Sequence, residues 1–256
     1  MFLFLLACSP STPPLTLAGS STIRPLAEVA AERFEAAHPG QRVSVQGGGS
    51  GVGVSAARSG LADIGMVSRS LKDDEADLEK VTIARDGIAL IAHASRAGTT
   101  LTTQQVFDIY TGVVSTWPDG APITVVNKEE GRSTRELFEH HFHIERFRDD
   151  LVVIGPNGQA ISTVASDPDA LAYVSIGSAA QAEADGIPVR RLGVDGIAAT
   201  VASVRDGSWP LSRELNLVTH GAPGPVAAEF IAFLGSPAGQ ALVVAEDFVP
   251  VADVAP

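Results

Sequence analysis

Residues 45–53 read VQGGGSGVG, a glycine run that follows the apolar stretch RVSV (42–45) and precedes the small-residue stretch VSAARSG (54–60). The apolar stretch is typical of a short strand and the small residues are typical of a helix, so the run is predicted to join the two. Glycine has no Cβ, and the first N–H groups of a helix have no partner within it. The run therefore exposes backbone donors where a helix begins.

The same order of strand, loop and helix begins the chain. LTLAG (15–19) predicts a strand, and Pro25 suits the first turn of a helix, which the serine and threonine residues before it can cap. HPG at 38–40 ends that helix, and LADIGMVS (61–68) predicts a third strand. Repeated strand, loop and helix units indicate an α/β fold with a largely parallel sheet.

The later sequence continues this pattern without an internal repeat or a stretch long enough to span a membrane. Residues 71–80 are strongly charged and predict a helix with a solvated face. We expect further strands at 86–94, 123–127, 170–177 and 215–219, and further helices at 102–112, 133–142, 225–236 and 237–247.

Composition limits the classes of ligand. The 256 residues carry a net charge of −12, which disfavours nucleic acid because phosphate neutralisation needs clustered Lys and Arg. This charge also repels small anions at long range, so an anion site here must act through short-range contacts. Hydrophobic residues make up 45% of the chain, enough for a substantial core.

The N-terminus, MFLFLLACSPSTPP (1–14), contains Cys8, the single cysteine of the chain. An intrachain disulfide is therefore excluded. The apolar run that ends in Leu-Ala-Cys is too short to span a bilayer and is similar to the end of a bacterial lipoprotein signal. We expect Cys8 to be lipidated and the Ser/Pro stretch after it to act as a flexible tether.

Three loops share one design, in which glycine and hydroxyl residues lie between a strand and a helix. They are GSST (19–22), GGGSGVG (47–53) and GRST (131–134). A helix N-terminus favours an anion through its unpaired N–H groups and its dipole. One such loop is explained equally well by ordinary capping; three in one chain predict a shared anion site if the fold brings them together.

Other interpretations of the glycine run are weaker. A P-loop requires Lys after the glycines, and a G-x-S-x-G nucleophile elbow requires glycine where Val52 stands. The dinucleotide variant G-x-G-x-x-A does match, at Gly51, Gly53 and Ala56, and Asp73 or Asp74 follows at about the spacing that this motif needs. A dinucleotide-dependent enzyme is therefore the alternative from a different class.

No group of residues predicts catalysis or a metal site. Three histidines, His140, His141 and His143, lie near a predicted helix end. A charged histidine is favourable there because of the helix dipole, and this is a simpler account of the cluster than a metal site. Asp63 and Asp86 are isolated acids at strand ends, for which a structural hydrogen-bonding role is the simpler account. We expect neither an enzyme nor a cofactor nor a metal.

From residue 15 onward the chain resembles the phosphate-binding proteins of bacterial phosphate ABC transporters. The resemblance implies a two-lobed periplasmic-binding-protein fold of type II with the ligand in the interlobe cleft. The expected division is a signal remnant and tether at 1–14, a first lobe at 15–88 plus 215–256, and a second lobe at 89–214. The blocks that carry the resemblance are LAGSSTIRPLAEVAAERF, VQGGGSGVGVSAARSGLADIGMVSR, DGIALIAHAS, VFDIYTGVVSTWPDG, VNKEEGRSTRELF, ALAYVSIG, DGSWPLSRELNLV and GSPAGQALVVAEDFVPV.

The resemblance also implies a set of phosphate-binding residues from the three loops and from the MVSR stretch. They are Ser20, Ser21, Thr22, Ser50, Gly51, Ser68, Arg69, Arg132, Ser133 and Thr134. The two lobes would close on the anion about a hinge where GIALIAHA and LNLVT cross.

Two departures from the family pattern affect specificity. Many relatives have an aspartate at the position of Ser68, and shorter ones have Ser-Arg, as here. The usual R-x-x-G-S-G-T loop of the second lobe begins here with Lys128 and contains Arg132. Arg132 would add a planar donor fork for an oxyanion, whereas the missing aspartate removes an acceptor that distinguishes protonated phosphate from sulfate.

The sequence thus predicts an extracytoplasmic solute-binding protein that delivers inorganic phosphate to an ABC permease. It would be a lipid-anchored monomer in the periplasm or at the cell surface, without nucleic acid as a partner. The same fold binding sulfate, molybdate or tungstate, and a phosphate-sensing accessory protein, remain as alternatives.

Overall fold

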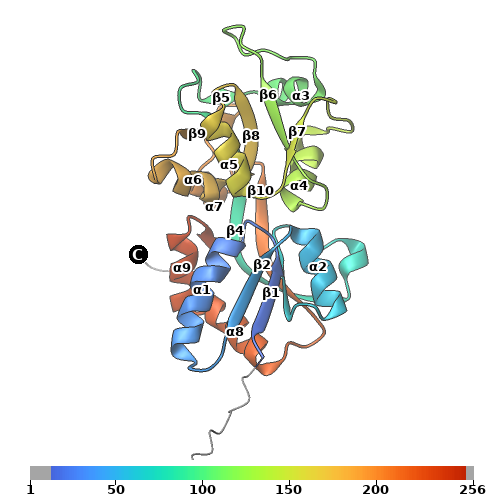
Figure 1. The fold of residues 1–256 in the computed structure, drawn as a ribbon, viewed down its shortest axis with the longest axis vertical. Coiled ribbons are helices and arrows are strands. Elements are labelled where there is room, and N and C mark those ends of the chain that lie inside the picture. Colours follow the sequence, from blue (N-terminus) through green and yellow to red (C-terminus); the bar gives the residue numbers. More distant parts are fainter. Residues whose placement is uncertain (1–12, 252–256) are drawn as a thin grey trace, which may run out of the picture.

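The computed structural model describes residues 13–251, which form an α/β structure with two lobes (Figure 1). Two long strands, β4 (Leu78–His93) and β10 (Ser212–His220), run between the lobes. The strand order along the sheet is β2-β1-β3-β10-β4-β8-β6-β7, so the crossing strands occupy its middle. Cys8 and most of the predicted tether lie outside the described residues.

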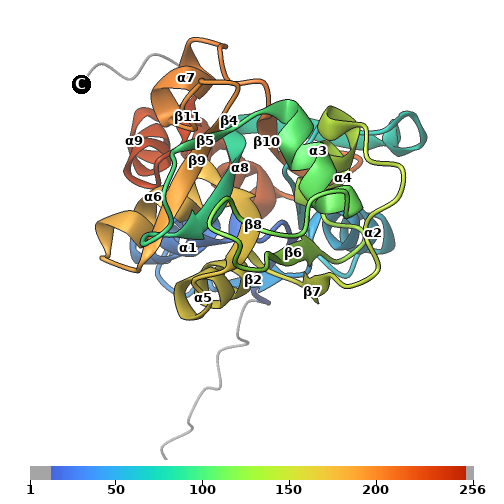
Figure 2. The same ribbon diagram turned by 90° about the horizontal axis from the view of Figure 1, so that it is seen from above.

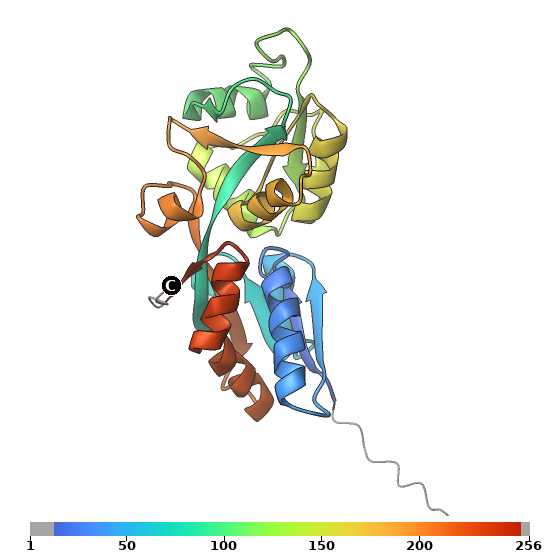
Figure 3. The same cartoon turned by 90° about the vertical axis from the view of Figure 1, so that its left-hand side faces the viewer.

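The first lobe is built on β1 (Leu15–Gly19), β2 (Val43–Gly47) and β3 (Ile64–Val67), in which β1 pairs in parallel with both neighbours. Its core centres on buried apolar side chains that include Leu17, Phe34 and Phe230. Four helices cover this sheet, and Figure 3 shows the first of them beside the last two. Their bounds are α1 (Arg24–Ala37), α2 (Ser50–Ser59), α8 (Pro225–Gly235) and α9 (Pro237–Ala245).

The second lobe has its own core, where Tyr173 stacks on Phe138 with ring centroids 3.9 Å apart. Figure 2 shows its helices arranged around β6 and β8. Its strands are β5 (Thr100–Leu101), β6 (Thr124–Lys128), β7 (Val152–Ile154), β8 (Ala170–Ser175) and β9 (Val189–Val194). Its helices are α3 (Thr103–Thr111), α4 (Ser133–Phe142), α5 (Asn157–Ser166), α6 (Ile176–Ala184) and α7 (Val201–Arg205).

The strand β4 changes partners along its length. Residues 78–87 pair with β10, whereas residues 88–93 pair with β8 and β9. The short strand β11 (Val249–Pro250) adds a further antiparallel pair to β4. The change of partners between residues 87 and 88 lies beside the expected lobe boundary, although the predicted division at 88/89 and 214/215 remains a prediction.

Two expectations about the elements were wrong. Residues 71–80 form no α-helix: a short 3-10 helix, Asp73–Glu75, precedes the first residues of β4. The charges that indicated a solvated face include Glu75, which is buried because it pairs with Arg69. The sheet is also not largely parallel, because both crossing strands pair antiparallel with their neighbours.

Across residues 13–251, no single helix is both long and apolar enough to cross a membrane. Helices α8 and α9 reach that length and apolar character only when they are taken together, and the chain bends by 65° between them.

Candidate functional site

Four serine hydroxyls meet between the lobes, one from each of the three predicted loops and one, Ser68, from the residue after β3. Ser20, Ser50 and Ser68 come from the first lobe and Ser133 from the second, and each is at most 2% exposed. Ser68 Oγ lies 2.8 Å from Ser20 Oγ, 3.4 Å from Ser50 Oγ and 2.6 Å from Ser133 Oγ. We call these four residues the hydroxyl cluster. It confirms that the fold brings the three predicted loops together.

The loops place Ser20, Ser50 and Ser133 at helix starts. At α1, Ser20 Oγ accepts from the N–H groups of Thr22 and Ile23, at 3.2 and 3.4 Å, whereas α2 and α4 begin without a capping side chain, as α5, α6 and α8 also do. By contrast, Thr102, Thr200 and Ser236 cap α3, α7 and α9 in the ordinary way. Uncapped N–H groups and the helix dipole both favour an anion at this point.

The glycine run allows the closest approach of the two lobes. Gly49, the residue before α2, has φ of +99°, and a Cβ there would lie 3.2 Å from the Gly131 carbonyl oxygen of the second lobe. Gly51 N donates to that same carbonyl oxygen at 3.1 Å. A Cβ at Gly53 would lie only 2.6 Å from the Met66 carbonyl oxygen, so α2 can pack this closely on β3 only with glycine there.

A buried ion pair between the crossing strands lies beside the cluster. Arg213 of β10 and Asp86 of β4 are paired in register, and their side chains are 1% exposed. The Arg213 guanidinium donates to Asp86 Oδ2 through Nε at 3.1 Å and through Nη2 at 2.8 Å. The guanidinium also donates to one hydroxyl from each lobe, Thr22 Oγ1 and Thr134 Oγ1, each at 2.9 Å. Arg213 is thus a fixed donor that both anion loops share.

Lys128 adds a second buried cation. It ends β6, is 2% exposed, and its Nζ donates to the Pro156 carbonyl oxygen at 3.2 Å. Burial, reinforced by the charges of Arg132 and Arg213, lowers the pKa of the Lys128 ammonium to about 7.

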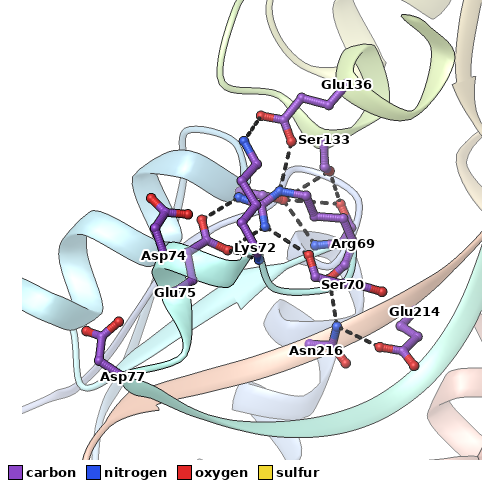
Figure 4. Close-up of polar contacts among 12 residues, drawn as sticks. Arg69, Ser70, Lys72, Asp74, Glu75, Asp77, Ser133, Glu136, Glu214 and Asn216 are labelled. Carbon is purple, nitrogen blue, oxygen red and sulfur yellow. Dashed lines mark hydrogen bonds and ion pairs between the residues drawn. The ribbon is translucent and has the colours of Figure 1, made fainter. Parts of the chain in front are cut away.

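Two predicted ligands lie elsewhere. Arg69 forms a two-pronged pair with Glu75, at 2.6 and 2.7 Å, and its Nε lies 2.8 Å from Glu136 across the cleft (Figure 4). Arg132 donates to Glu129, and its guanidinium packs against Gly155. Carboxylates hold both guanidinium groups, and neither hydrogen-bonds to the hydroxyl cluster. Their predicted role as anion donors is therefore not supported by the positions of their side chains.

The other predicted residues lie in or beside the cluster. Thr22 and Thr134 are buried and bonded to Arg213, as described above, and Gly51 bridges the lobes through its backbone. Ser21 is half-buried at the start of α1, where Ile23 rather than a predicted hydroxyl residue is the residue before the helix. Whether these hydroxyls and amides bind an anion stays a prediction.

Three residues of this region were not predicted as ligands. Arg213 stands in WPLSR, one of the blocks that carried the family resemblance, and that block was the signal that could have identified it. Asp86 was considered only as an isolated acid. Asn157 opens α5 and donates to Thr22 Oγ1 at 3.3 Å, and nothing in its local sequence marks it.

The site does not support the rival interpretations. Asp73 and Asp74 lie on the short 3-10 helix, not at the end of the strand that follows the glycine loop, where a ribose would need them. Within residues 13–251, no group of three or more His, Cys, Asp or Glu residues is arranged to hold a metal ion.

Comparison with known proteins gives a consistent result. Residues 8–238 match the family described as the PBP superfamily domain. A putative phosphate ABC transporter substrate-binding protein from Clostridium perfringens, solved with bound phosphate, is 31% identical; the match covers 94% of this chain and 100% of that one, with a TM-score of 0.86. An ABC-type phosphate transport receptor from Vibrio cholerae is 28% identical, over 93% of this chain and 100% of that one, with a TM-score of 0.74.

The curated relatives of this chain are also named as phosphate-binding proteins. The phosphate-binding protein PstS of Bacillus subtilis (strain 168) is 24% identical over 249 residues, which are 94% of this chain and 81% of that protein. Together with the two-lobed fold, these matches show that the chain belongs to the PBP superfamily, among the phosphate-binding proteins of ABC transporters.

Proposed function

We propose that this protein captures inorganic phosphate at the hydroxyl cluster and delivers it to an ABC importer. The observation that carries the proposal is the meeting of four buried serine hydroxyls, from both lobes, beside the network of Arg213. A tetrahedral anion placed there would replace hydroxyl–hydroxyl contacts with hydroxyl–anion contacts, which are stronger. Because ligands come from both lobes, binding would hold the lobes together.

The proposed ligand set consists of the hydroxyls of Ser20, Ser50, Ser68 and Ser133 and the amides that open α1, α2 and α4, with Ser21, Thr22, Gly51 and Thr134 beside them. Arg213 supplies the fixed charge that the sequence assigned to Arg69 and Arg132. Asp86 balances that charge, so the site attracts an anion mainly by hydrogen bonds at short range. This suits a chain whose net charge is −12.

Asp86 also supports phosphate over sulfate. Among the described residues, its Oδ1 is buried and has no hydrogen-bond partner. A carboxylate oxygen of this kind accepts a hydrogen bond from the O–H group of hydrogen phosphate and repels a fully ionised sulfate. Asp86 thus supplies a negatively charged hydrogen-bond acceptor, which Ser68 cannot supply because its side chain is a neutral hydroxyl.

The proposed activity is binding without bond cleavage. Within residues 13–251, none of the four serine hydroxyls is hydrogen-bonded to His, Asp or Glu, so no base is placed to activate a nucleophile. We further propose an extracytoplasmic monomer that Cys8 anchors through a lipid.

Calorimetric titration of phosphate-free protein tests this function. We expect heat on addition of micromolar phosphate and no heat with sulfate, molybdate or tungstate. Binding of one of those three anions without phosphate binding would instead assign the site to another oxyanion. Neither kind of binding would refute the site altogether.

A further inference from the structure

Asn157 closes one side of the proposed anion site. It is the first residue of α5, it is 4% exposed, and its side chain reaches from the second lobe to the first. Its Nδ2 donates to Thr22 Oγ1 at 3.3 Å and to Ser178 Oγ at 3.2 Å. Thr22 Oγ1 is the same hydroxyl that accepts from Arg213. The Asn157 side chain therefore contacts the network around the hydroxyl cluster directly.

An interlobe cavity of about 410 Å³ lies on the other side of Asn157. This is within the range of cavities that hold small organic ligands. Helices α1, α5 and α6 and residues 246–248 form its walls, which include the apolar surfaces of Pro25, Ile161 and Phe248.

One layer of side chains separates this cavity from the hydroxyl cluster. Ser21 and Asn157 line the cavity, whereas Ser20 and Thr22, the neighbours of Ser21 in the chain, belong to the cluster and its Arg213 network. The Asn157–Thr22 hydrogen bond therefore connects the wall of the cavity to the Arg213 network beside the cluster. Inorganic phosphate needs no room there, but an ester substituent does.

We propose that Asn157 is a specificity-determining residue that restricts the site to unesterified phosphate, and that its removal would admit phosphate monoesters with the substituent in the cavity. The inference rests on the proposed phosphate function. The exclusion is steric, because Asn157 occupies the path between cluster and cavity, and its two hydrogen bonds fix it in that position.

The charges of the cavity define the class of substituent that would enter. Glu28 and Glu246 line it, and the one lining cation, Arg24, is already paired with Glu28 at 2.7 Å. Uncharged and cationic substituents therefore fit this cavity better than a carboxylate does. Methyl phosphate and phosphoethanolamine are suitable probes, and 3-phosphoglycerate is the disfavoured one.

The test compares phosphate-free wild type with Asn157→Gly and Asn157→Ser, using titration calorimetry with inorganic phosphate and the three esters. Wild type should bind phosphate and reject all esters. Both variants should gain affinity for methyl phosphate and phosphoethanolamine by roughly 10- to 100-fold, with a smaller gain for 3-phosphoglycerate. Phosphate affinity should fall by no more than about tenfold, because only one of the two lost hydrogen bonds, the neutral one to Thr22, joins the network around the anion site. Gln181→Ala, which changes an exposed side chain of the same cavity away from Asn157, should behave like wild type.

The outcomes separate the two proposals. Wild type that binds no phosphate refutes the proposed function. Wild type that binds phosphate and methyl phosphate equally overturns the role of Asn157 and leaves the phosphate function intact, and this result needs no variant. Folded variants, checked by thermal melting, that bind phosphate but still reject every ester overturn it in the same way.

Discussion

Arg213 and Arg69 both lie between the lobes, and the side chains around them differ. At the centre, Arg213 meets one carboxylate and two hydroxyls, and its side chain is 1% exposed. At the rim, Arg69 meets two carboxylates, Glu75 and Glu136, and Lys72 also pairs with Glu136, at 3.0 Å (Figure 4). We refer to Thr22, Asp86, Lys128, Thr134 and Arg213 as the centre, and to Arg69, Lys72, Glu75 and Glu136 as the rim.

The difference shows how position decides the role of a charged group. Each rim cation is paired with a carboxylate of the rim, so the rim connects the lobes through ion pairs. The centre has one carboxylate for two buried cations and keeps hydroxyls that an anion can engage. Glu75 illustrates the rim: although burial opposes it, hydrogen bonds from Arg69 and the Lys72 amide hold the pKa of its carboxyl below the ordinary value.

The largest expected effect follows removal of the central charge. Arg213→Gln should lower the free energy of unfolding by about 3–5 kcal/mol, because it leaves Asp86 buried without its counter-charge. It should also abolish phosphate binding at micromolar concentrations. Chemical denaturation and calorimetric titration measure the two effects.

A second change separates binding from stability. Asp86→Asn combined with Arg213→Gln removes both charges, so stability should be partly restored while phosphate binding stays absent. If the double variant binds phosphate like wild type, Arg213 is a structural residue only.

The next effect is a pH dependence between pH 7 and 10.5, which the centre should have and the rim should lack, because the lowered pKa of the rim residue Glu75 acts only in the acid range. The pKa of Lys128 falls from its ordinary value of 10.5 to about 7 on folding, so between these values the unfolded chain holds a proton that the folded chain has lost. The free energy of unfolding should therefore rise with pH over this window, by at most about 1.4 kcal/mol per unit, and Lys128→Met should flatten the profile. Denaturation curves at several pH values, without phosphate, measure it. An unchanged slope in Lys128→Met would assign the titration to another group.

The sequence predicted the residues between the lobes only in part, for physical reasons. Loop composition and helix starts are local features, so the positions of Ser50, Ser133 and the helix α4 could be predicted. The partner of a long charged side chain is not local: Arg69 and Arg132 were assigned to the anion, but carboxylates nearby hold them both. Arg213 and Asp86 lie 127 positions apart in the chain, and only the register of the crossing strands brings them together.

The four hydroxyls should each contribute less than Arg213. Ser50→Ala and Ser133→Ala should each weaken phosphate binding by about 1.5–3 kcal/mol, the value of a hydrogen bond to a charged group. Ser55→Ala, on the exposed face of the same helix as Ser50, provides the matched control and should bind like wild type. Equal affinities in all three variants would place the anion elsewhere.

The smallest effect is expected at the rim. Glu136→Gln should weaken phosphate binding by no more than about 1 kcal/mol, mainly through faster dissociation, because partly exposed ion pairs contribute little. The loss should shrink further at high salt, which screens the rim but not the buried centre. Stopped-flow dissociation at two ionic strengths tests this, and a salt-independent effect larger than that of Ser50→Ala would reverse the roles of rim and centre.

A crystal structure of the protein with phosphate retained or soaked tests the central claim most directly. The account predicts one tetrahedral anion within hydrogen-bond distance of the Ser20, Ser50, Ser68 and Ser133 hydroxyls, on the side of Asn157 away from the interlobe cavity. An anion bound instead by Arg69 at the rim, or within the cavity lined by Pro25 and Phe248, would contradict it.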